Sequence, residues 1–143
     1  MGAELGKLLV IGLNFPPEHT GIAPYTGALA KGLSEDNRVE VITAYPHYPS
    51  WKIADGYGGW KKKESLGNPS VTRVLHYIPS KPQGLRRLLS EVSFGLRSSL
   101  SDWGKPNAVL LVSPALVSSA IALAKANASF RQIPTVVWVQ DLY

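Results

Sequence analysis

Apolar segments that alternate with helical or irregular stretches constrain the fold of this chain most strongly. The apolar segments span 7–13, 39–44, 108–112 and 135–139, and the stretch 71–78, whose apolar residues alternate weakly, predicts a further strand. Because strands covered on both faces read as nearly continuous apolar runs, such segments are typical of a parallel sheet. Helices are expected over 24–34, 83–103 and 115–128. This order predicts an α/β fold with a Rossmann-like, doubly wound parallel sheet, and right-handed crossovers favour the strand order 3-2-1-4-5.

Size and composition fit one domain with a core of its own. The chain has 143 residues, of which 45% are hydrophobic and 17% are charged, so disorder is excluded. It has no cysteine, which excludes disulfides, thiolate metal sites and cysteine nucleophiles. Every apolar run is far shorter than the ~20 residues that span a bilayer, and no cleavable signal is visible. We therefore expect a cytoplasmic protein. Because the sequence stops just after the fifth strand, we expect 1–143 to be the front part of a longer protein.

Basic residues concentrate in the middle of the chain. Residues 52–105 carry ten Lys/Arg and four Asp/Glu, whereas the rest of the chain carries five and six. This imbalance suggests an anionic partner, such as a phosphate-bearing ligand or a membrane surface, although a solvated loop and helix would also explain it. The aromatic-rich stretch 45–70 is predicted to be irregular, and an irregular stretch of that length is often functional.

Ligands of open α/β sheets bind at the carboxyl ends of the strands, which selects 14–24, 45–50, 113–114 and 140–143. Here the segment 19–23 leads into a helix, whose amino end offers unpaired N–H groups to an anion, and Gly21 allows close approach. A helix that is simply capped after a loop, and binds no ligand, would have the same sequence features. The first turn is not G-x-G-x-x-G, no acid ends the second strand, and no phosphate-binding P-loop motif occurs. These features argue against dinucleotide oxidoreductases and P-loop NTPases.

Few single residues carry a chemical signal. His19 and His47 fall on the expected ligand side, His76 falls in a strand, and no metal-ligand spacing appears. Asp141 follows the last strand, where its carboxylate could act as a base, bind hydroxyls or simply belong to a turn. Ser113 precedes Pro114 without a G-x-S-x-G elbow, so we expect it to line the cleft rather than attack a substrate.

The helix expected over 83–103 combines a leucine stripe with Arg86, Arg87 and Arg97. If the stripe faces the sheet, this is an ordinary amphipathic helix. If part of it is exposed, cations next to leucines would dock on anionic lipid. The three arginines are therefore candidates for facing a membrane.

Several segments together resemble the opening of family 4 retaining glycosyltransferases, in the branch that includes colanic-acid and other exopolysaccharide enzymes. The longest is VIGLNFPPEHTGIAPY at 10–25, followed in the same order by TAYPHYP at 43–49, VSP at 112–114 and VQDLY at 139–143. The resemblance implies a GT-B enzyme with two Rossmann-like domains, of which 1–143 is the amino-terminal, acceptor-side domain and the carboxy-terminal donor domain is absent.

That resemblance also implies a site and its partners. The loop carrying His19, Thr20, Gly21 and Ile22 would lie near the donor phosphates and the acceptor, with His47 and Ser113 on the acceptor side of the cleft. Many relatives place a histidine where Ser113 stands, so that histidine's role does not transfer. The co-substrate would be a nucleotide sugar, the acceptor a lipid-linked glycan, and no cofactor or metal would be needed. The isolated fragment would be inactive. Apart from the resemblance, nucleic acid is not expected as a partner, because the sequence carries no recognisable nucleic-acid reader motif.

Two rival functions remain open from sequence. The domain could be a stand-alone α/β module that binds a phosphorylated small molecule without catalysis. It could instead be a peripheral membrane adaptor, an idea that rests on the basic helix alone. An open reading frame that ends at Tyr143 would favour the first rival, whereas continuation for ~200 residues, a typical domain length, would favour the enzyme.

Overall fold

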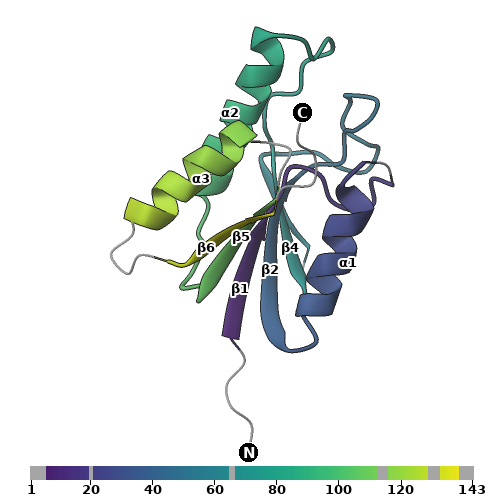
Figure 1. Cartoon of the computed structure of the whole chain (residues 1–143). Coiled ribbons are helices and arrows are strands. Elements are labelled where there is room, and N and C mark those ends of the chain that lie inside the picture. Colours follow the sequence, from purple (N-terminus) through teal and green to yellow (C-terminus); the bar gives the residue numbers. More distant parts are fainter. Residues whose placement is uncertain (1–5, 20, 65–66, 113–115, 129–132, 139–143) are drawn as a thin grey trace, which may run out of the picture.

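A computed structural model describes residues 6–19, 21–64, 67–112, 116–128 and 133–138. It shows a twisted sheet with α1 on one face and α2 and α3 on the other (Figure 1). The helices and strands in chain order are β1 (Gly6–Ile11), α1 (Ala23–Leu33), β2 (Asn37–Ala44), β3 (Lys61–Glu64), β4 (Ser70–Val74), α2 (Leu85–Leu100), β5 (Ala108–Val112), α3 (Leu116–Ala128) and β6 (Thr135–Trp138).

The strand order confirms the predicted fold class, with one added edge strand. The sheet runs β3-β4-β2-β1-β5-β6, and the five strands other than β3 pair in parallel in the predicted 3-2-1-4-5 arrangement. The prediction that all of 45–70 is irregular was wrong for 61–64, because β3 pairs antiparallel with β4. Three exposed lysines begin β3, so its sequence lacks the apolar pattern of a buried strand. A charged edge strand of this kind also resists pairing with other chains.

The last strand is less covered than predicted. The stretch 135–139 was expected to be buried, yet Val136 is 59% exposed and Val137 is 39% exposed. The reason is position, since β6 is the edge strand of the sheet next to β5. The apolar sequence therefore predicted the strand correctly but did not predict how much of it is exposed.

Helix α2 presents its leucines to solvent, contrary to the ordinary amphipathic interpretation. Its buried positions are Ser90, Phe94, Gly95 and Ser98. A Cβ atom at Gly95 would lie 2.9 Å from the backbone Cα of Ser118, so this small face allows α2 to approach α3 closely. Leu85 and Leu100, by contrast, are 68% and 81% exposed. Predicted membership of Trp103 in the helix was also wrong: it lies beyond the end of α2, buried, with its indole N–H donating to the Ser98 carbonyl at 2.9 Å.

Two hydrophobic clusters hold the layers together, one on each face of the sheet. The first joins β1, β2, β4 and β5 to α2 and α3 through Phe94, Trp103, Ala122 and neighbouring strand residues. The second joins the opposite strand faces to α1 through Ala30 and to the loop after β1 through Phe15. Residues of β1, β2, β4 and β5 are thus covered on both sides. This cover explains why β1 and β5 read as continuous apolar runs.

Candidate functional site

The loops that follow β1 and β2 meet at the carboxyl edge of the sheet. β1 lies between β2 and β5, and the helices that follow β1 and β5 cover opposite faces (Figure 1). The chain therefore reverses its winding direction between β1 and β5, which is where open α/β sheets form a crevice for ligands. The candidate site is consequently the surface formed by the residues that follow β1 and β2.

Glu18 joins these two loops through a buried carboxylate. Its Oε2 accepts the backbone N–H of His47 at 2.7 Å and of Tyr48 at 2.8 Å, and its Oε1 accepts the Asn14 side-chain amide at 3.0 Å. The Glu18 side chain is only 2% exposed. Hydrogen bonds to an ionised acceptor are stronger than neutral ones, so this residue sets the position of the loop after β2 relative to the loop after β1.

Gly21 adopts a backbone conformation that side chains rarely permit. Its φ is +64°, and a Cβ atom there would lie 3.5 Å from the Tyr48 ring. Gly21 itself is exposed, so a ligand can approach its backbone. The glycine was singled out from sequence, and the structure places it beside the loop that carries His47.

The amino end of α1 lies directly after this glycine. Ile22 is its N-cap residue, Pro24 lies in its first turn, and neither a side-chain cap nor an acidic first-turn residue occurs among the described residues. The first N–H groups of a helix lack intrahelical partners and carry partial positive charge. This end of α1 therefore favours an anionic group, and nothing acidic in its first turn opposes one.

His47 and His76 form a buried contact beneath the loop after β2. Their ring centroids lie 5.0 Å apart, and the His47 Nδ1 lies 2.8 Å from the Tyr45 carbonyl oxygen. Both ring nitrogens of His76 are buried with no hydrogen-bond partner in the described part of the chain. Burial, and secondarily the neighbouring His47, lowers the pKa of His76 to about 3. His76 is thus held neutral.

This burial makes folding stability depend on pH. In the unfolded chain His76 binds a proton near its ordinary pKa of about 6.5, whereas the folded chain binds one only near 3. Between these values the unfolded state binds more protons, so the free energy of unfolding falls as pH falls. From about pH 7 to about pH 5 we expect a loss on the order of 2 kcal/mol. Urea denaturation of wild type and His76→Phe at both pH values should show this loss in wild type only. An equal loss in the variant would contradict the assignment.

A buried guanidinium on β4 holds several segments together at the same carboxyl edge of the sheet. Arg73 is 1% exposed and donates to the carbonyls of Ala44, at 2.9 Å, and of Pro16. Its Nε donates to the Glu64 carboxylate at 3.2 Å. One side chain thereby connects the end of β2, the loop after β1 and the edge strand β3. It positions the candidate site without facing it.

Most of the predicted site residues in the described ranges come together. His19, Gly21, Ile22 and His47 belong to the two adjoining loops, and His19 is exposed. Three predicted residues, Thr20, Ser113 and Asp141, lie outside the described residues. The helix arginines lie elsewhere, on α2.

Sequence reasoning missed two residues that organise the edge, Glu18 and Arg73. The pattern of charged residues in the sequence could have identified both. Glu18 is the only Asp, Glu, Lys or Arg between residues 8 and 30, and Arg73 is the only one between 71 and 75. A lone charge within an otherwise uncharged segment must be paired if the fold buries it.

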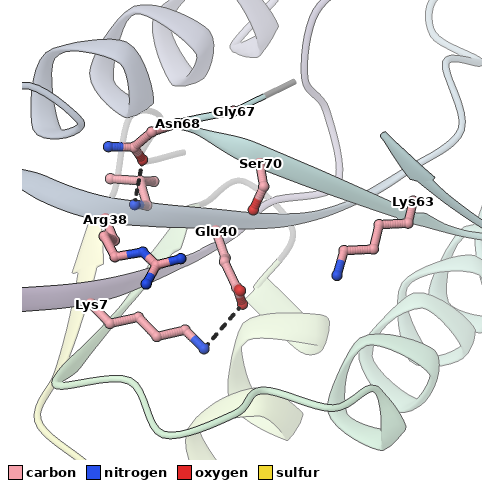
Figure 2. Close-up of a pocket in the computed structure, with 8 residues that line it drawn as sticks. Lys7, Arg38, Glu40, Lys63, Gly67, Asn68 and Ser70 are labelled. Atoms are coloured by element: carbon pink, nitrogen blue, oxygen red, sulfur yellow. Dashed lines mark hydrogen bonds and ion pairs between the residues drawn. The ribbon is translucent and has the colours of Figure 1, made fainter. Parts of the chain in front are cut away.

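The opposite rim of the sheet holds a separate hollow. It encloses about 490 Å³ and is lined by residues near the starts of β1, β2 and β4 and near the end of β3, including Lys7, Arg38, Glu40 and Lys63. Figure 2 shows Lys7 reaching toward Glu40, with which it forms an ion pair at 3.4 Å. The hollow lies at the amino ends of the strands, away from the edge where this class of sheet binds ligands. No group of three or more His, Asp or Glu suited to a metal occurs in the described residues.

The fold and the loop geometry define a Rossmann-like α/β domain with an anion-favouring edge. Over 116 residues, 77% of its length, the chain is 39% identical to the putative colanic acid biosynthesis glycosyl transferase WcaI of Escherichia coli K12. The matched region spans 28% of that relative. No protein-family model matches the chain. No described helix is both long and apolar enough to cross a membrane.

Proposed function

We propose that this chain is the acceptor-side domain of a glycosyltransferase of family 4 with the GT-B fold. The full protein would transfer a hexosyl or related sugar from a nucleotide-sugar donor to a lipid-linked glycan in exopolysaccharide or glycolipid synthesis, at the cytoplasmic face of the membrane. The single observation that carries the proposal is exposed Gly21, in the left-handed backbone region directly before the amino end of α1, for which the described residues provide no side-chain cap. The similarity to a putative colanic acid glycosyl transferase supports it.

The chemistry of sugar transfer explains why such a loop is useful. When the bond between sugar and nucleotide breaks, negative charge develops on the departing diphosphate. Backbone N–H groups and a helix amino end stabilise that charge without reorganising. Gly21 lets the phosphate and the reacting sugar approach the backbone, with Thr20 and Ile22 flanking it, while Glu18 keeps the neighbouring loop in place.

Other residues would take supporting roles in this proposal. Asp141 would bind sugar hydroxyls or act as a base after the last strand, and Ser113 would line the acceptor side of the cleft. His19 is exposed at the loop and available to the acceptor, whereas buried His47 would shape the cleft wall. A carboxy-terminal domain would hold most of the donor. No cofactor or metal is required in this proposal.

A transfer assay tests the proposal. Full-length protein, labelled nucleotide sugars and a membrane-lipid extract are expected to yield label in the lipid fraction, while residues 1–143 alone yield none. The rival is a stand-alone module that binds a phosphorylated small molecule. Binding of nucleotide sugar by the full-length protein without any transfer, across donors and lipid extracts, would favour that rival. Transfer by residues 1–143 alone would contradict the assignment of this chain as one half of the site.

A further inference from the structure

A charged hollow lies at the amino ends of the strands, on one face of the sheet. Lys7 of β1 is the register partner of Arg38 of β2. Two residues further along β2, Glu40 is the register partner of Ser70 of β4. Register partners, and residues two apart on one strand, point to the same face of a sheet. The four side chains therefore share one face, and the hollow of about 490 Å³ there is lined by strand and loop residues.

Three cations from three strands line this hollow, which we call the amino-rim hollow. Lys7, Arg38 and Lys63 extend into it from β1, β2 and β3, around Glu40 (Figure 2). The Lys7 ammonium pairs with the Glu40 carboxylate at 3.4 Å. Among the described residues, Arg38 and Lys63 have neither an ion pair nor a side-chain hydrogen bond. Two positive charges are therefore left for an anionic ligand.

Two hydroxyl groups add hydrogen-bond donors on the same face. Ser70 lines the amino-rim hollow, and Thr72, the register partner of Lys63, lines an adjoining hollow of about 200 Å³. Both residues are half-buried, and neither hydroxyl has a hydrogen-bond partner within the described part of the chain. A hydroxyl can donate to a phosphate oxygen. The donors that remain unused are thus those that an anion with several oxygens requires.

The walls of the amino-rim hollow are held by hydrogen bonds that use none of the cationic groups. The Asn68 side chain accepts the Val39 N–H at 2.7 Å and donates to the Asn37 carbonyl at 2.7 Å. The Asn107 side chain accepts the backbone N–H of Lys7 at 2.8 Å, and the Asn107 N–H donates to the Lys7 carbonyl at 2.8 Å. The cations therefore project from a fixed backbone, which lowers the ordering cost of binding a ligand.

Gly104, in the loop after α2, leaves room for the Lys7 ammonium. Its φ is +64°, and a Cβ atom at this position would collide with the Lys7 Nζ. The Gly104 N–H donates to the Asp102 carboxylate at 2.8 Å, so that carboxylate is engaged by its own loop. The backbone here is shaped around the ammonium group, which indicates that Lys7 has a defined position at this rim.

We propose that the amino-rim hollow binds a diphosphate group, as inorganic pyrophosphate or as a nucleoside diphosphate. Because β4 lies between β2 and β3, the backbones of Arg38 and Lys63 are at least about 10 Å apart. Two linked phosphate groups span such a pair better than a single phosphate. The hollow lies on the rim opposite Gly21, so a ligand there leaves the candidate site open. The inference is consequently independent of the proposed sugar transfer.

Calorimetric titration of the full-length protein with pyrophosphate tests the site. We expect wild type to bind it, with at least about tenfold weaker binding of inorganic phosphate. Arg38→Gln with Lys63→Gln should weaken the binding of pyrophosphate about tenfold or more, because two charge-assisted contacts are lost. Glu40→Gln should strengthen it about threefold, since a carboxylate that repels the ligand is removed. A role in folding alone would not produce this gain.

The matched control, Arg86→Gln with Arg87→Gln, removes two exposed cations on α2 and should change pyrophosphate binding less than about twofold. Competition by uridine or guanosine diphosphate identifies the source of the diphosphate group. Displacement of pyrophosphate at lower concentration than pyrophosphate itself requires would assign the hollow to a nucleoside diphosphate. Weaker displacement would assign it to inorganic pyrophosphate. Either result supports recognition of a diphosphate group.

The remaining outcomes overturn the proposal. These are no binding of pyrophosphate by wild type, binding of phosphate as tight as that of pyrophosphate, and an equal loss in the control pair. Unchanged affinity in Arg38→Gln with Lys63→Gln, or a loss of affinity in Glu40→Gln, would also contradict it. If only Gly21→Trp abolished binding, the anion would be held at the carboxyl edge of the sheet and not at this rim.

Discussion

Replacing Glu18 by alanine is expected to lower the free energy of unfolding by about 3–5 kcal/mol. The change removes the buried carboxylate, one oxygen of which accepts the backbone N–H groups of both His47 and Tyr48. Each hydrogen bond to a charged group contributes about 1.5–3 kcal/mol, and both N–H groups would remain without that acceptor. The loss should appear in urea denaturation at neutral pH.

Two variants sharpen this prediction. Glu18→Gln keeps one oxygen for the two N–H groups but directs an amide at the Asn14 amide, so about 1–2 kcal/mol should be lost. Glu35→Ala removes an exposed carboxylate just after α1 and should stay within about 0.5 kcal/mol of wild type. A loss below about 1 kcal/mol for Glu18→Ala would mean that the carboxylate does not hold the two loops together.

Replacing Arg73 by methionine is expected to cost a similar amount, about 3–5 kcal/mol. Methionine fills much of the volume but leaves the carbonyls of Ala44 and Pro16 without their donor, and leaves the Glu64 carboxylate unpaired. Removing one partner of a buried pair is far more costly than replacing both. Thermal and urea denaturation should both report the loss.

The companion variants separate charge pairing from packing. Adding Glu64→Gln to Arg73→Met should recover part of the loss, because the uncompensated charge is gone while the carbonyls stay unpaired. Arg38→Met, on an exposed arginine of β2, should stay within about 0.5 kcal/mol. If Arg73→Met matches that control, the guanidinium does not connect β2, β3 and the loop after β1.

The parallel sheet was predictable because four of its five strands are apolar segments, and because the helices before β2, β5 and β6 leave few ways to connect them. Strand β3 was not predictable, because residues 61–64 are mostly lysine and form a strand only by pairing with β4. The burial of α2 also escaped prediction. Leucine spacing identified a helix face, but the small residues Ser90, Gly95 and Ser98 decided which face turns inward.

The location of the candidate site was predictable from sequence, but the buried charged residues that hold its loops in place were not. Gly21 and His47 could be placed at one edge because the carboxyl ends of parallel strands share an edge. Glu18 and Arg73 could not be paired from sequence, because the partners through which they join separate elements are backbone groups 29 to 57 residues away along the chain. Only the folded backbone shows which carbonyl or N–H group a buried charge will meet.

Sugar transfer by a matched pair of glycine variants tests most directly whether this edge handles the sugar phosphate. Gly21 and Gly67 both have left-handed backbones, with φ of +64° and +86°, and both are exposed. Tryptophan at either position should cost a similar strain of about 1–2 kcal/mol. In full-length protein, Gly21→Trp is expected to abolish transfer of labelled sugar to lipid, while Gly67→Trp, on the opposite rim, retains it. Equal activity of the two folded variants, or loss only with Gly67→Trp, would contradict the account.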